Sequence, residues 1–256
     1  MQTSQSPQSR GPAGRLIQKW MPASPIAEAQ FPPTKLTNLK YFSKKIPVRS
    51  LTDSMRYFTR ALGVRCQYCH VAGKEPNDLA SYNFASDEKP TKVKARIMLK
   101  MVAAINKDHL GKLPSRSEPP LSVACITCHR GVAQPRPIEQ IVLAAYAAGG
   151  ADSAEAAYRA LRQRYYGAAA YDFGEVPLAD AADALRSQGK TADAVRFYVL
   201  NTTLLPTSGF AHRQAAGGYL AAGDTASAIA MLEKALAINA NDRQAQQLLA
   251  TLRPKH

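Results

Sequence analysis

The sequence predicts a mostly α-helical protein in which helix-turn units precede an α-α repeat domain. Three observations support this fold class. Apolar residues recur at helical spacing along most of the chain after residue 50. The pentapeptide Cys-x-x-Cys-His occurs twice, each time after a predicted helix and a turn. The C-terminal part of the sequence contains an internal repeat with a period of 34 residues. With 256 residues, 46% of them hydrophobic, the chain can bury one or two cores of ordinary size.

Residues 1–47 are predicted to form an extended arm. They contain seven prolines, which interrupt helices and strands, and they show little apolar periodicity. Ala27-Glu28-Ala29 could serve as the cleavage site of an export signal, but the apolar run that such a signal needs is missing. No stretch approaches the ~18 consecutive apolar residues of a transmembrane helix, so we expect none.

The next region, residues 48–138, opens with a helix and the first Cys-x-x-Cys-His motif. Apolar residues recur at helical spacing over 51–62, and Gly63 is a typical helix end. Cys66-Gln67-Tyr68-Cys69-His70 follows at once. This order predicts a unit of helix, turn and motif.

A second unit of the same kind follows. Asp87-Glu88-Lys89-Pro90 is typical of a helix start, and an apolar stripe over 93–105 continues toward Gly111. Prolines then break the chain before Cys125-Ile126-Thr127-Cys128-His129. Both motifs therefore belong to one predicted domain that ends at residue 138.

Residues 139–256 predict a repeat domain. Gly189–Ala194 aligns with Gly223–Ala228 at the 34-residue period, and small residues stand at Ala194, Ala228 and Ala235, where two helices would touch closely. This length and pattern resemble the tetratricopeptide repeat. The predicted helices are 176–188, 191–204, 210–222 and 225–238. An earlier pair at 139–148 and 152–165 has the shape of such a helix pair but does not align in the 34-residue register.

The two motifs carry a specific chemistry. In Cys-x-x-Cys-His, two thiols one helical turn apart can add across the vinyl groups of haem, and the adjacent histidine can ligate its iron. All four cysteines, Cys66, Cys69, Cys125 and Cys128, are used in this way, with His70 and His129 as proximal iron ligands. We therefore expect two covalently attached c-type haems.

Two other readings of the cysteine pairs are weaker. A zinc ribbon usually separates its pairs by ~15–20 residues, whereas 55 residues separate Cys69 from Cys125. A thioredoxin-like redox pair would need a surrounding βαβ pattern, which is missing.

Each iron has a sixth position, for which methionine and histidine are the usual ligands in electron transfer. Met55 lies one helix upstream of His70, and Met98 and Met101 lie one helix upstream of His129. His109 follows Met98 by three helical turns and is a further candidate. A methionine on an apolar helix face is more often packing than ligand, so the residues alone leave this choice open.

Four stretches together resemble the cytochrome subunit of photosynthetic reaction centres, over about residues 37–137. They are Leu62–His70, Ala85–Pro90, Ala95–Met101 and Cys125–Gly131. The resemblance implies helix-turn-motif units in which the first methionine of each helix is the axial ligand. It thus pairs Met55 with the first haem and Met98 with the second, and makes Met101 a packing residue.

The chain departs from that family in two respects. Well-known members carry four haems as two paired halves, whereas this chain has one half, and they lack a repeat domain of this kind. A small diheme electron carrier of a respiratory or extracellular chain fits the residues as well as a photosynthetic role does.

The leading functional hypothesis is electron transfer by two c-type haems, not enzymatic catalysis. Two alternatives stay open: a peroxidase-like haem enzyme with one open iron position, and an interaction subunit in which the repeats are primary. We expect the repeats to bind protein, either a partner complex or copies of the same chain. Covalent haem attachment in this family implies a periplasmic or extracellular location, with membrane association only through a partner.

The charge distribution bears on the partners. The net charge is +14, and residues 1–140 hold 22 basic and 9 acidic side chains. Haem propionates can neutralise part of this excess, and the rest suits an acidic redox partner or a membrane-bound complex. Nucleic acid is not expected, because no aromatic platform or binding motif accompanies the basic residues.

Overall fold

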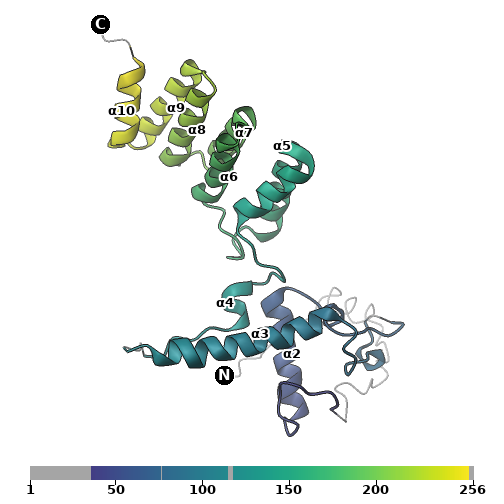
Figure 1. The fold of residues 1–256 in the computed structure, drawn as a ribbon. Coiled ribbons are helices and arrows are strands. Elements are labelled where there is room, and N and C mark those ends of the chain that lie inside the picture. Colours follow the sequence, from purple (N-terminus) through teal and green to yellow (C-terminus); the bar gives the residue numbers. More distant parts are fainter. Residues whose placement is uncertain (1–35, 76, 115–117, 254–256) are drawn as a thin grey trace, which may run out of the picture. The chain divides into compact units, whose positions relative to one another are not determined.

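The structure, a computed structural model, describes residues 36–75, 77–114 and 118–253 (Figure 1). These residues are mostly helical and form no β-strand; one isolated bridge joins Val71 to Asn83. The predicted fold class is therefore confirmed. The predicted arm at 1–47 lies largely outside the described residues.

The first helix-turn-motif unit is present as predicted. Helix α2 (Val48–Leu62) ends at Gly63, which has the left-handed φ of 65°. The first motif follows as a 3-10 turn, η1 (Cys66–Tyr68), and a second 3-10 turn, η2 (Leu79–Ser81), lies in the loop beyond it.

The second unit is built on α3 (Pro90–Ala104), which begins with the expected proline in its first turn. The helix continues as a π-helical turn, η3 (Ile105–His109), and a 3-10 turn, η4 (Leu110–Lys112). The second motif forms its own short helix, α4 (Cys125–His129). The predicted helix over 90–111 is thus confirmed, with a change of helix type near its end.

Helix α5 (Ile138–Tyr165) corresponds to the predicted early pair. Gly149 and Gly150 have non-helical backbone angles, so two helical segments meet there at a kink. The sequence predicted two helices around this glycine pair, and the second glycine has the positive φ of 73° that favours glycine.

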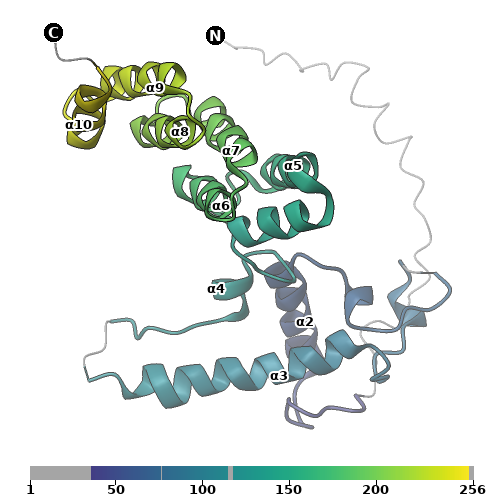
Figure 2. The same cartoon turned by 45° about the horizontal axis from the view of Figure 1, so that its top comes forward.

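The predicted repeat helices agree with the structure to within one residue. They are α6 (Glu175–Ser187), α7 (Thr191–Leu204), α8 (Gly209–Ala221) and α9 (Thr225–Ile238). In Figure 2 these helices follow one another as successive antiparallel pairs. The next helix, α10 (Arg243–Leu252), was not predicted.

Helix α10 continues the same period. The first helices of the successive units begin at Glu175, Gly209 and Arg243, which are 34 residues apart. The side chain of Asp242 accepts hydrogen bonds from the backbone N–H groups of Gln244 and Ala245 and so caps the helix. This cap, placed one period after Ser208, which caps α8, was the signal in the sequence.

The repeat core is formed by small residues between larger ones. Ala194, Ala228 and Ala235 are fully buried, as their positions predicted. Tyr198 and Leu232, one period apart, are also buried. The closest contact is between Gly218 of α8 and the Tyr198 ring of α7, where a Cβ on Gly218 would lie 2.5 Å from Tyr198 Cδ2. Only glycine fits at this position.

The chain divides into two compact units. Of the described residues, one unit contains those up to Thr59 and those within Arg65–Val123, and the other contains Arg60–Val64 and those from Ala124 to Arg253. The second motif therefore packs with the repeats, and the domain boundary after residue 138 stays a prediction. None of the described helices is both long and apolar enough to cross a membrane.

We expect Gly218→Ala to destabilise the repeats by about 1–3 kcal/mol, because the added methyl group overlaps the Tyr198 ring. Gly217→Ala is the matched control. Its Cβ would meet nothing within 4 Å, and alanine favours the helix by up to about 1 kcal/mol. Urea unfolding followed by circular dichroism measures both, and equal stabilities would contradict the proposed close packing.

Candidate haem sites

The first motif is a tight turn that gathers its functional groups. The N–H groups of Cys69 and His70 both donate to the Cys66 carbonyl, at 3.1 and 3.0 Å. The hydroxyl of Thr91, at the start of α3, donates to the Tyr68 carbonyl. Helix α3 is thereby joined directly to the first motif. Burial raises the pKa of the Cys69 thiol, which keeps it protonated at neutral pH.

His70 is held in an aromatic pocket. The Phe84 ring meets it edge-on at 5.0 Å between centroids, and Tyr82 stacks on Phe84 at 5.4 Å. Burial, and then the nearby charge of Lys92, lower the pKa of His70 to about 4. The imidazole is therefore neutral at physiological pH, which is the form that ligates a metal. Its buried Nδ1 makes no hydrogen bond of ordinary geometry, although the Phe84 backbone is close enough to act on its pKa.

Asp87 connects three separate segments around this pocket. Its carboxylate accepts from Lys40 at 2.6 Å, from Arg96 at 2.8 Å and from Lys92 at 3.2 Å. These hydrogen bonds hold the pKa of Asp87 far below its usual range. We call these four residues the Asp87 cluster. The cluster fixes the loop after the first motif against α3.

The second motif presents its histidine in the form expected of an iron ligand. The Nδ1 atom of His129 lies 2.9 Å from the Val132 carbonyl. In this arrangement Nδ1–H donates to the carbonyl and Nε2 keeps its lone pair for a metal, which is the usual hydrogen bonding of metal-ligating histidines. Burial also raises the pKa of the Cys125 thiol, while Cys128 is exposed.

Asn106 holds the chain just before the second motif. Its side-chain amide donates to the Val123 carbonyl at 2.8 Å, and its carbonyl accepts from the Val123 N–H at 2.8 Å. Asn106 stands in the π-helical turn that continues α3. Val123 precedes Cys125 by two residues, so this pair sets the register between α3 and the entry to the motif.

The turn after the second motif packs on the end of α2. The Gly131 N–H donates to the carbonyl of Ala61, a fully buried residue, at 2.9 Å. A Cβ on Gly63 would lie 1.9 Å from the Gly131 oxygen. Position 63 therefore requires glycine for two reasons: its φ is positive, and the Gly131 oxygen leaves no space for a side chain.

The predicted distal ligands lie on helices or on the turn that continues α3. Met55 is half-buried on α2, and His109 is exposed in the π-helical turn. Met98 and Met101 are 44% and 45% exposed on α3. The assignment of Met55 and Met98, with Met101 and His109 as secondary candidates, stays a prediction.

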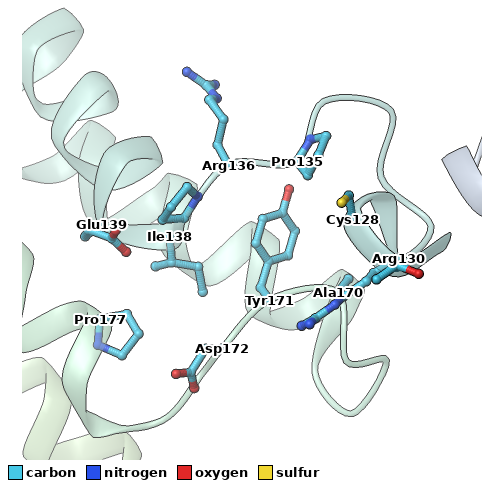
Figure 3. Close-up of a pocket in the computed structure, with 12 residues that line it drawn as sticks. Cys128, Arg130, Pro135, Arg136, Ile138, Glu139, Ala170, Tyr171, Asp172 and Pro177 are labelled. Atoms are coloured by element: carbon cyan, nitrogen blue, oxygen red, sulfur yellow. The ribbon is translucent and has the colours of Figure 1, made fainter. Parts of the chain in front are cut away.

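An open pocket of about 510 Å³ lies beside the exposed Cys128. Figure 3 shows the Cys128 sulfur facing the Tyr171 ring and Pro135. Arg130 and Arg136 also line the pocket. The loop before α6, which contributes Ala170, Tyr171 and Asp172 to this pocket, therefore lies beside the second motif.

The residues present fit haem in their packing as well as their donor atoms. Before Ile138, Ala61 and Tyr82 are the only buried apolar residues in the described part of the chain. Apolar side chains of α3, among them Val93 and Ile97 at 42% and 62%, stay exposed. Flat apolar porphyrins would cover such a face. By contrast, no group of three or more His, Cys, Asp or Glu side chains among the described residues could hold a metal ion.

Sequence reasoning missed the residues that support the motifs. The Asp87 cluster, Asn106 and the Gly63–Gly131 contact all depend on partners far away in the chain. The sequence indicated Asp87 only as part of a helix start, and Gly131 only as the end of a stretch that carries the family resemblance. Asn106 carried no local signal.

The two Cys-x-x-Cys-His turns are of the kind that attaches haem in c-type cytochromes. Comparison with known proteins agrees. Residues 66–160, just over a third of the chain, match the family model of the photosynthetic reaction centre cytochrome C subunit. The resemblance that the sequence predicted is therefore supported from the first motif onward.

Two known cytochromes are similar to part of this chain. Cytochrome c-554 of Chloroflexus aurantiacus is 41% identical over 78 residues, covering 30% of this chain and 16% of that protein. The photosynthetic reaction center cytochrome c subunit of Thermochromatium tepidum is 38% identical over 71 residues, covering 28% of this chain and 14% of that protein. The chain thus matches only about a sixth of the length of these relatives.

Gly63→Ala should disturb the second site more than Gly131→Ala. Both positions have positive φ, but only Gly63 lacks room for a methyl group, since Gly131 would meet nothing within 4 Å. We expect a lower melting temperature and less covalent haem for Gly63→Ala, measured by calorimetry and by the mass of the denatured protein. Equal losses in both variants would show that backbone conformation alone matters.

Proposed function

We propose that this protein transfers electrons through two covalently attached c-type haems. The observation that carries the proposal is the pair of Cys-x-x-Cys-His turns, one of which holds its histidine by an Nδ1 bond to a backbone carbonyl. When bound, each haem supplies an iron that changes oxidation state by one electron. The protein positions the ligands, buries the haem face and sets the local charge.

The ligand assignments follow from the motifs and the resemblance. Cys66 and Cys69 would attach the first haem, with His70 as proximal and Met55 as distal ligand. The matching set for the second haem is Cys125, Cys128, His129 and Met98. Six-coordinate irons leave no position for a substrate, which favours a carrier over an enzyme.

Natively expressed protein should carry the mass of two haems after denaturation, with a c-type α band on reduction. Oxidised protein should show the weak sulfur-to-iron absorption band. Met55→Leu and Met98→Leu should each remove part of this band, whereas Met101→Leu, on the same helix as Met98, is the control and should keep it.

Other outcomes would contradict parts of this proposal. An unmodified mass would exclude covalent haem. Loss of the band in Met101→Leu and not in Met98→Leu would move the second ligand to Met101. Carbon monoxide binding to the reduced wild-type protein would reveal an open iron position and favour the peroxidase-like alternative.

We further propose that the tetratricopeptide-like repeats dock the cytochrome to a partner complex or to copies of itself. The support is the regular stack of 34-residue helix pairs, since repeats of this architecture present extended binding surfaces. The basic excess before residue 140 suits an acidic redox partner or a membrane-bound complex. Haem attachment of this type implies a periplasmic or extracellular location.

Val176→Glu tests the docking proposal on the surface of the repeats. Val176 is 48% exposed on α6, so the variant should keep its fold and haem content. A charge on this apolar surface should weaken co-sedimentation with membranes of the native host or self-association in ultracentrifugation. Exposed Ser187→Glu, on the same helix, is the control, and unchanged association of Val176→Glu would argue against this face.

A further inference from the structure

The Asp87 cluster carries more positive than negative charge. Lys40, Lys92 and Arg96 all surround the one carboxylate of Asp87, which gives the four side chains a formal charge of +2. Lys40 is well exposed, at 59% of its side-chain surface, whereas Lys92 and Arg96 are only 11% and 16% exposed. Two of the three cations are therefore poorly screened by solvent.

Lys92 is held in a fixed position beside the His70 pocket. Its ammonium group donates to the carbonyls of Phe84, Ala85 and Ser86 at 2.8, 3.1 and 2.7 Å, in addition to its contact with Asp87. The ring of Phe84 is the one that meets His70 edge-on. Phe84 therefore contacts both the Lys92 ammonium group and the His70 ring. The ammonium group cannot rotate away without losing all these hydrogen bonds.

The cations near His129 are placed differently. Arg130, which follows it in sequence, and Arg136, which lines the pocket beside Cys128, are both exposed, so solvent screens their charges. A fixed and poorly screened positive charge favours the reduced form of a nearby iron. Lys92 and Arg96, which are only slightly exposed, would therefore favour the reduced iron at the first site more than these arginines do at the second.

We propose that Lys92 and Arg96 raise the reduction potential of the haem held by His70 above that of the haem held by His129. Lys92 and Arg96 are positioning and tuning residues that act through the Phe84 loop. This inference rests on the proposed two-haem function.

The test is a potentiometric titration of the haem-loaded full chain, followed by absorption. Lys92→Gln removes a positive charge and should lower the higher of the two potentials, shifting its reduction equilibrium about tenfold, which is 59 mV for one electron. Asp87→Asn removes the negative charge and should raise the same potential. Lys94→Gln, at an exposed position on the same helix, should leave both potentials unchanged.

The two variants are expected to shift the reduction potential in opposite directions, which distinguishes an electrostatic role of the cluster from a purely structural one. Lys92→Gln and Asp87→Asn both break the cluster, so a purely structural role would move the potential in the same direction in both variants, and that result would overturn the inference. A shift of the lower potential would also overturn it. Haem mass and the α band are measured first, so that failure of haem attachment, which would refute the proposed function, is distinguished from an unchanged potential.

Discussion

The close backbone contact between Gly63 and the turn of Gly131 is the constraint on which the haem region depends. The Gly131 N–H bonds to the Ala61 carbonyl, and no side chain fits at Gly63. Gly63 precedes Cys66 by three residues, and Gly131 follows His129 by two. The contact therefore fixes the end of α2 against the turn that follows the second motif, and both belong to the same compact unit.

The two halves of the chain achieve stability by different means. The repeats bury a continuous core of alanine, leucine and aromatic side chains. The region before Ile138 relies on polar contacts: the Asp87 cluster, the Asn106 pair with Val123 and the bonds within the motifs. Its helix α3 presents apolar side chains outward. Haem binding, as proposed above, would cover these side chains and supply the apolar contacts that the region otherwise lacks.

The same polar contacts give the two proposed sites unlike surroundings. His70 lies among aromatic rings with fixed cations close by, whereas His129 is held by a backbone carbonyl. Two chemically identical motifs thus become inequivalent through their neighbours. The grouping of the second motif with the repeats adds a further difference, because a partner bound to the repeats would lie on the unit that also contains Cys128.

The sequence by itself determined the helices, the two motifs and the 34-residue period, because each depends on the spacing of residues near one another in the chain. It predicted which cysteines and histidines would hold haem for the same reason. Helix α10 was missed although its Asp242 cap repeats the period. Only the tertiary structure decided the Asp87 cluster, the Asn106–Val123 pair and the need for glycine at position 63, since these contacts join residues distant in sequence. The local sequence shows which chemical groups are present, and long-range packing decides which of them come into contact.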